Sequence, residues 1–458
     1  MKEIEIKKLA FKRFNALAGL SRSPAASYVS RELAWYSNEE ETILGVLLID
    51  IIDNDYVAIL MAMDEFGRYR CFETECSIAS LEEAKSWLIR AMKWHTCQNM
   101  KVYPQGGETT GLDLFTPIVP PEKQHPYFIR LCSDSAFSPA RSIINKMMPH
   151  YVDIDGNFAE QFQSAGFDAR LWELYLNNYL AEEELFIDRE HNSPDFIVTK
   201  YDKTVAIEAV IVGRKKENPP KYFKILPEMG SLKDIKEVHK NEMPIKFGSP
   251  LYTKLKKEYW ELPHVKGNPL VFAIADFHDD QSMIWSSTAL INYLYGVEHE
   301  FYYDENNQLI IIPIEIGSHR SEDKEIPSGF FFQPHSENVS AILSSASGTI
   351  SKFNRIGRQA GFSDPSIKMI RMGTCHDHDP NASVPKLFSY QVDENTEETW
   401  AEGLSMFHNP NALYPVPREL FPTIAHHEFK NGQIVSQLPE FHPYASLTFN
   451  IRITGKDA

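Results

Sequence analysis

Three carboxylates in the middle of the chain, Glu173, Asp195 and Glu208, could together bind a metal ion. Glu208 lies inside the apolar run VAIEAVIV, where a charge is costly to bury unless it has a partner or a metal. Neighbouring strands lie about 4.8 Å apart, so a hairpin with its turn near 201–203 would bring Asp195 close to Glu208. Carboxylate oxygens are hard ligands that suit Mg²⁺ or Mn²⁺, and we expect these two residues to bind such a cation.

The elements that must position these acids can be predicted from the spacing of the apolar residues. Glu173 lies beside the apolar stripe of a predicted helix, from which it could point at the same cation. In chain order we expect a helix, three strands, a helix and a strand, over 169–184, 185–189, 195–200, 204–212, 251–261 and 269–277. The last strand is almost wholly apolar, which is typical of a strand at the centre of a sheet.

Pro194-Asp195, Glu208-Ala209-Val210 and the upstream Glu173 resemble the motif of the PD-(D/E)xK nucleases, the superfamily with the restriction-endonuclease-like fold. The resemblance covers about 168–278, and the family core has the same order of elements. It implies that Asp195 and Glu208 bind Mg²⁺ (or Mn²⁺) and that Glu173 assists. It also implies hydrolysis of phosphodiester bonds in DNA or RNA by a metal-activated water, in restriction or anti-phage defence.

The family has a lysine two residues after the glutamate, where this chain has Val210. Some members of the superfamily supply that lysine from the following helix. The helix predicted over 251–261 carries Lys254, Lys256 and Lys257, and we expect Lys254 to take the catalytic role. Its positive charge would stabilise the negative charge that develops on the phosphate.

A basic stretch follows the strand that carries Glu208. Between Arg214 and Lys257 the chain has twelve Lys and Arg against five Asp and Glu, a local charge of +7 in a chain of net charge −17. The remainder carries −24, which excludes a protein that is basic throughout. Side chains expected to contact nucleic-acid phosphates are Arg214, Lys215, Lys216, Lys256 and Lys257. Aromatic residues that could stack on bases are Tyr222, Phe223, Tyr252, Tyr259 and Trp260.

The length of 458 residues suggests about three domains. We expect an N-terminal α+β domain over 1–145, the nuclease-like core over 150–296 and a β-rich accessory domain over 297–458. The fold class is α/β, with α+β character overall and a mixed sheet in the core. No apolar run is long enough to span a membrane. The five cysteines are odd in number and have no CxxC spacing, which indicates reduced thiols instead of disulfides or a zinc site. We therefore expect a cytoplasmic protein.

The sequence is also compatible with other functions. The same fold could be catalytically inactive and act as a scaffold that binds nucleic acid or a protein, which Val210 favours. A separate group of residues could bind a transition metal, although no HExxH or Cys/His spacing accompanies it. That group consists of His376, Asp377, His378, Asp379, His426, His427 and His442. DNA is favoured over RNA as a partner, and a homodimer is plausible because cutting both strands of a duplex requires two sites.

Overall fold

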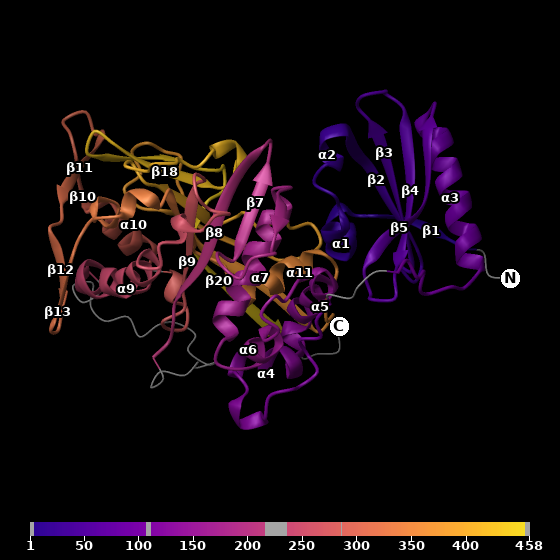
Figure 1. Cartoon of the computed structure of the whole chain (residues 1–458), viewed down its shortest axis with the longest axis horizontal. Helices are drawn as coiled ribbons and strands as arrows, with labels where there is room; N and C mark the ends of the chain where they lie inside the picture. The colour runs from indigo at the N-terminus through magenta and orange to yellow at the C-terminus, as the bar shows by residue number, and fades with distance from the viewer. Residues whose placement is uncertain (1–3, 107–110, 216–235, 285, 454–458) are drawn as a thin grey trace.

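The computed structural model describes residues 4–106, 111–215, 236–284 and 286–453. Figure 1 shows two parts side by side, an N-terminal unit (residues 4–106) and a larger body formed by the described residues after 110. Both parts have helices packed on β-sheets, so the chain is a mixed α/β protein, as its sequence predicts. Within the described ranges, no helix is both long and apolar enough to cross a membrane.

The N-terminal unit is a five-stranded antiparallel sheet in which each strand pairs with the next along the chain. Its strands are β1 (Ile6–Leu9), β2 (Ser30–Asn38), β3 (Ile43–Asp50), β4 (Tyr56–Met63) and β5 (Tyr69–Ile78). Helix α3 (Leu81–Cys97) covers one face, α1 (Phe11–Ala18) packs on the other, and the short α2 (Ala26–Val29) leads into β2. Gly45 lets α3 approach closely, because a Cβ there would lie 2.7 Å from the Met92 sulfur.

The body is built on an eight-stranded sheet with the order β19-β18-β17-β14-β9-β8-β7-β6. Its strands are β6 (Phe186–Asp188), β7 (Phe196–Lys200), β8 (Lys203–Val212), β9 (Leu270–Asp276), β14 (Ala341–Ser345), β17 (Leu404–His408), β18 (Ala425–Lys430) and β19 (Gln433–Gln437). Strands β6, β7 and β8 form an antiparallel meander, β9 is parallel to β8, and β14 is parallel to β9. Every residue of β9 is buried, as expected for a central strand.

Helices cover both faces of this sheet. Helix α7 (Phe167–Glu182) lies on one face with α5 (Ser138–Met147) and α11 (Ile350–Gln359), while α9 (Met243–Leu255) and α10 (Ser287–Tyr295) lie on the other. The Trp172 indole of α7 donates a hydrogen bond of 2.8 Å to the Ala273 carbonyl of β9. The remaining α-helices of the described residues are α4 (Pro126–Ser133) and α6 (Phe158–Gln163). Their remaining strands form the hairpins β10 (Val297–Tyr303)–β11 (Leu309–Glu315) and β12 (Ser318–Ser321)–β13 (Lys324–Pro327), and the sheet of β15 (Ile367–Cys375), β16 (Lys386–Gln391) and β20 (Pro443–Arg452).

The order of elements predicted around the three acids is confirmed, since α7, β6, β7, β8, α9 and β9 follow one another along the chain. The second helix was expected over 251–261, but it begins at Met243 and ends at Leu255, and Tyr259–Glu261 forms a separate 3-10 turn. Its first turns carry Met243 and Phe247, which continue the apolar face of Leu251 and pack in the core beneath the sheet. Pro244, Gly248 and Pro250, which usually disfavour a helix interior, obscure that periodicity in the sequence.

The boundaries between the parts differ from the expected ones. Residues 297–458 contribute β14, β17, β18 and β19 to the same sheet as β8 and β9, so no separate core begins at 297. Helices α4 and α5, expected in the N-terminal domain, pack in the core of the body with α7. Parallel pairing joins segments far apart in sequence and leaves no local signal, which is why composition alone misplaces these boundaries.

A buried group of charges joins α11 to the C-terminal strands. Glu398 accepts two hydrogen bonds from Arg355, at 2.7 and 2.8 Å, and pairs with Lys352 at 2.8 Å. Arg371 of β15 lies 3.5 Å from the same carboxylate and also pairs with Glu402. All three cations and Glu398 are buried, so their positive charges depend on these two carboxylates.

Replacement of Glu398 by Gln should lower the free energy of unfolding by about 3–5 kcal/mol, because buried cations then lack their counter-charge. Urea denaturation followed by circular dichroism measures the change. Glu397→Gln is the matched control, since Glu397 is the exposed neighbour and its replacement should change stability by less than about 0.5 kcal/mol. Equal stability of the two variants would contradict the structural role of the cluster.

Candidate active site

The β7–β8 hairpin brings Asp195 and Glu208 together. Phe196 pairs with Ile207 in the hairpin register, which places the preceding Asp195 at the level of Glu208. The turn is as tight as predicted, because Tyr201 and Asp202 take the left-handed conformation with φ of 53° and 57°. The Ala209 N–H donates a hydrogen bond of 2.7 Å to Asp195 Oδ2, and this bond fixes the carboxylate beside β8.

The surroundings of Asp195 disfavour its negative charge. Burial, followed by the charges of Glu208 and Glu173, raises the pKa of Asp195 to about 7, against the backbone hydrogen bond from Ala209. Two carboxylates this close cannot both stay ionised without compensation. The site therefore favours a proton or a cation beside Asp195.

Glu208 is 4% exposed and has two partners, Lys254 in the last turn of α9 and Tyr259 just after this helix. Lys254 Nζ forms an ion pair with Glu208 Oε1, and the Tyr259 hydroxyl donates a hydrogen bond of 2.7 Å to the same oxygen. Burial, followed by the charge of Glu208, raises the pKa of Tyr259, so this hydroxyl remains a donor.

Val210, two residues after Glu208, is an apolar core residue. Its side chain is on the same face of β8 as Glu208, and it packs in the core with Leu251 and Leu255 of α9. Helix α9 crosses this face, and Lys254 reaches Glu208 from there. Lys254 and Glu208 thus meet in space, although 46 residues separate them in the sequence.

Glu173 is near the pair but is held by other residues. Arg170 Nη1 lies 2.7 Å from Glu173 Oε1, Arg189 Nη2 lies 3.9 Å from Oε2, and the Tyr151 hydroxyl donates to Oε2 at 3.3 Å. Burial raises the pKa of Glu173, although both arginines oppose this shift. Glu173 therefore acts on Asp195 through its charge, as an ion-paired carboxylate on the opposite face of the sheet.

The donor set fits Mg²⁺ or Mn²⁺ better than a transition metal. In the described chain, no three His, Cys, Asp or Glu side chains meet as a metal-binding group, so Glu173 does not join Asp195 and Glu208 as a third ligand of the same cation. Asp195 and Glu208 offer two carboxylates, and Mg²⁺ is commonly bound by one or two carboxylates with water completing its shell. Burial and the charges of the neighbouring acids raise the pKa of Asp195, and a bound cation would favour its charged form.

The residues predicted to contact nucleic acid differ in how exposed they are. Lys215, Lys256 and Lys257 are exposed, and Lys256 lies 4.5 Å from the centre of the Tyr252 ring. Arg214 is not on the surface, because it pairs with Asp168 at 3.3 Å and with Asp280 at 2.8 Å and only 11% of its side chain is exposed. Lys216, Tyr222 and Phe223 lie outside the described residues.

Two features of the site were missed from the sequence. Tyr259 was assigned to base stacking, whereas it is buried and contacts Glu208. Arg170 and Arg189 were not singled out as partners of Glu173. The spacing of three residues between Arg170 and Glu173 is the signal that could have identified the first of them, because such residues are neighbours on a helix.

The C-terminal histidines pair with one another and with the backbone. His408 and His426 lie 2.9 Å apart through their ring nitrogens, and the His442 carbonyl accepts the His376 N–H at 2.9 Å. Burial lowers the pKa values of His427 and His442, so these rings stay neutral. These contacts hold the histidines in the sheet, and none of the described ones belongs to a group of three metal ligands.

Comparison of the chain with protein-family models, with curated proteins and with solved structures found no match. The interpretation of the site therefore depends on its own geometry and on the motif in the sequence.

The charge of Asp195 should destabilise the metal-free protein at neutral and higher pH. Its pKa is raised on folding from 3.8 to about 7, so its contribution to stability is fully present below pH 3.8 and is lost as the pH rises through 7. Asp195→Asn keeps an acceptor for the Ala209 N–H and cannot ionise, so it does not lose this stability as the pH rises. In EDTA, the melting temperature of Asp195→Asn relative to the unmodified protein should be several degrees higher at pH 8 than at pH 5. The same difference at both pH values would show that the charge is not responsible.

Proposed function

We propose that this protein is a metal-dependent nuclease with a restriction-endonuclease-like core over about 150–285. The observation that carries the proposal is the meeting of Asp195, Glu208 and Lys254 at one place, with the lysine supplied by α9. The topology supports it, because α7 precedes the β6-β7-β8 meander and α9 leads to β9, parallel to β8. This is the element order that the PD-(D/E)xK resemblance implies.

Each residue has a distinct task in this proposal. Asp195 and Glu208 would hold Mg²⁺ or Mn²⁺, which when bound would polarise the phosphate and lower the pKa of a water molecule. Tyr259 orients Glu208 from the buried side through its hydrogen bond. Lys254 has 24% of its side chain exposed, so its ammonium can contact a phosphate beside the two acids and stabilise the charge that develops there.

The substrate class follows from charge. Lys215, Lys256 and Lys257 are exposed cations within a protein of net charge −17, and they flank the segments that carry Glu208 and Lys254. Such a local basic surface is expected to contact the sugar-phosphate backbone of nucleic acid. We infer DNA as the favoured substrate, with restriction or anti-phage defence as the setting and a homodimer as the form that cuts both strands.

The alternative is a nuclease-like scaffold without catalytic activity. The observation in its favour is that Lys254 already neutralises Glu208, which could satisfy the acid with no metal bound. This scaffold would still bind nucleic acid through the exposed lysines. Cleavage assays separate the two functions.

The proposal is tested by incubating the protein with supercoiled plasmid, linear duplex, single-stranded DNA and RNA, in Mg²⁺, Mn²⁺ or EDTA. We expect cleavage only with a metal, and Asp195→Asn, Glu208→Gln and Lys254→Ala should each lower its rate by about 100-fold or more. Lys266→Ala is the control, because Lys266 is an exposed lysine outside the site and its loss should leave the rate unchanged. Metal-dependent cleavage that survives in Asp195→Asn and Glu208→Gln would disprove the site assignment. Absence of cleavage with salt-sensitive binding retained would support the scaffold.

The exposed lysines should contribute to binding and not to chemistry. In the Asp195→Asn background, Lys256→Ala/Lys257→Ala should weaken DNA binding and reduce the slope of log affinity against log salt by about 2. Fluorescence anisotropy with labelled duplex at several salt concentrations measures this slope. Lys7→Ala/Lys8→Ala removes a matched exposed pair from β1 and should leave the slope unchanged. An equal effect of both double variants would mean that binding follows net charge alone.

A further inference from the structure

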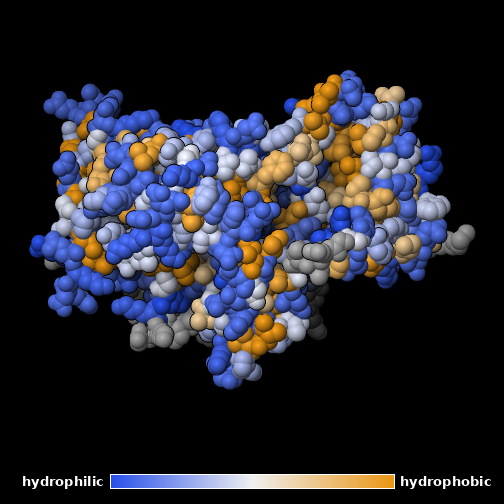
Figure 2. Space-filling model, in the orientation of Figure 1, coloured by the Kyte–Doolittle hydropathy of each residue, from blue (hydrophilic) through white to orange (hydrophobic). Residues whose placement is uncertain are grey.

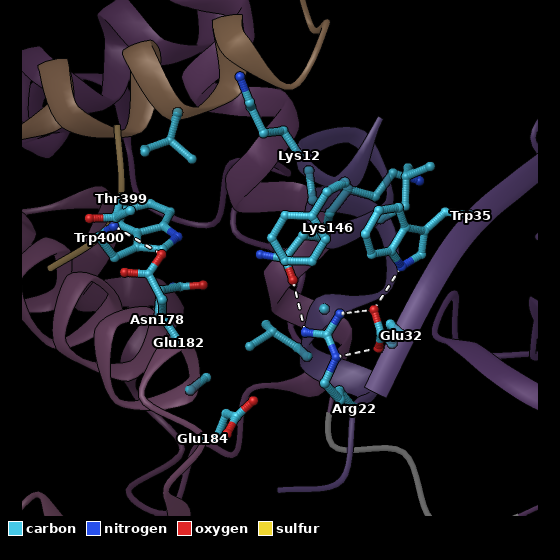
Figure 3. Close-up of a pocket in the computed structure, with 18 of the residues that line it drawn as sticks. Lys12, Arg22, Glu32, Trp35, Lys146, Asn178, Glu182, Glu184, Thr399 and Trp400 are labelled. Carbon is cyan, nitrogen blue, oxygen red and sulfur yellow. Dashed lines mark hydrogen bonds and ion pairs between the residues drawn. The ribbon is translucent and has the colours of Figure 1, made fainter. Parts of the chain in front are cut away.

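Two regions of the molecule have no role in the proposed active site. One is a cavity of about 670 Å³ between the N-terminal unit and the body, where Figure 2 shows the surface hollowed. Four Lys and Arg side chains and five Glu side chains line it. Arg22 and Trp35 both donate hydrogen bonds to Glu32 (Figure 3), and both oxygens of Glu182 accept backbone N–H groups of the 400–401 segment. Charges of both signs, held by one another and by the backbone, favour no single class of ligand.

The other region is the three-stranded antiparallel sheet with the order β16-β15-β20. Its inner face is polar and packs on α11. Arg371 of β15 donates a hydrogen bond of 2.7 Å to the Ser446 hydroxyl. Arg355 of α11 donates a bond of the same length to the Thr448 hydroxyl. Because side chains alternate between the two faces of a strand, the residues next to Arg371, Ser446 and Thr448 in the sequence point outward.

The outer face of this sheet is apolar. By strand alternation and register, its apolar side chains are Ile370, Met372, Leu387, Leu447, Phe449 and Ile451. Leu387 is 79% exposed, Ile451 47% and Met372 43%, and the other three are half-buried. Within the described ranges, none of the six belongs to a hydrophobic core. A sheet with one face towards solvent usually has polar residues on that face, so the reversed arrangement marks an interaction surface.

The charges on and beside this face indicate its partner. Lys368, near the start of β15, is the one charged side chain that the described strands direct outward. One cation is too few for a nucleic-acid surface. Asp377 and Asp379 follow the other end of β15, about 30 Å from Lys368 at the rise of a β-strand. In the described chain none of these three residues has an ion pair.

We propose that two copies of this chain pack their outer faces together, related by a two-fold axis that lies between the sheets and crosses β15 at right angles near Met372. A two-fold axis brings the same patch of both copies into contact. In this orientation the two β15 strands are antiparallel, so Lys368 of each copy lies beside Asp377 and Asp379 of the other. Elsewhere the net charge of −17 makes two copies repel each other, whereas this face has no acid.

This interface deepens the proposed function, on which its purpose rests, because cutting both strands of a duplex requires two sites. The interface itself depends on the apolar face and on the arrangement of Lys368, Asp377 and Asp379 along β15.

Sedimentation velocity of the full chain tests the proposal. We expect a species of twice the mass of the chain, and Met372→Glu should weaken the dimer at least about 100-fold, because two carboxylates then meet at the axis. Leu447→Glu should do the same, since Leu447 lies opposite Met372 in the register. Ile52→Glu is the matched control, because Ile52 is 68% exposed on the N-terminal unit and its replacement should leave the dimer intact.

The charge pairs have a separate test. Lys368→Glu should weaken the dimer about tenfold, because it places like charges together. The combined variant Lys368→Glu/Asp377→Lys/Asp379→Lys should restore the dimer, since it re-forms the same pairs with the signs exchanged. A role of Lys368 within one copy alone would predict no such restoration.

Three results would overturn the proposal. They are a monomer at every concentration, a dimer that Met372→Glu and Leu447→Glu leave intact, and a dimer lost in Phe301→Glu alone. The last result would place the interface at the β10–β11 hairpin, where Phe301 is 54% exposed. Circular dichroism verifies that each variant folds, and Met372→Glu carries the test if Leu447→Glu does not fold. A dimer that fails to cut DNA would disprove only the nuclease, and a monomer that cuts it would disprove only the interface.

Discussion

The pairing register of the β7–β8 hairpin is the constraint on which the candidate site depends. A two-residue turn at Tyr201 and Asp202 sets this register, and the register places Asp195 beside Glu208. A shift by one residue would turn Glu208 to the other face of the sheet, away from Lys254 and Tyr259. It would also place Val210 outside the core that α9 covers. Since β8 has apolar residues on both faces, the tight turn and the partners of Glu208, more than the apolar pattern, select this register.

Helix α7 connects the separate regions of the molecule. Its Trp172 is bonded to β9, its Glu173 influences the charge of Asp195, and its Glu182 lines the cavity beside the N-terminal unit. A helix buried on nearly all sides has little freedom to move independently, because its neighbours are closely packed. Helix α7 therefore packs on the sheet that carries the acid pair and also forms one wall of the cavity.

The basic side chains of the described residues have different surroundings in the interior and on the surface. The whole chain is acidic, but some of its cations are buried in ion pairs and others are exposed. Arg355 and Arg371 are buried with Glu398, Arg214 pairs with Asp168 and Asp280, and Lys256 and Lys257 stay exposed. Local charge in a sequence therefore indicates a possible contact surface, but burial decides which cations can reach a ligand.

The sequence by itself determined the local parts of this protein. The apolar periodicity predicts α7, β7, β8 and β9, and the turn between β7 and β8 predicts that Asp195 and Glu208 approach each other. These predictions succeed because helix and strand patterns and tight turns depend on residues close together in the chain.

Only the tertiary structure decided the rest. It brings Lys254 and Tyr259 to Glu208, pairs Arg214 inside the protein, and adds β14 to the sheet beside β9. It also creates the cavity between Trp35 and Glu182, whose walls come from opposite ends of the sequence. These contacts depend on how helices cross the sheet and on which distant strands pair. The free energy of such packing is shared among many buried residues, so no short stretch of sequence reports it.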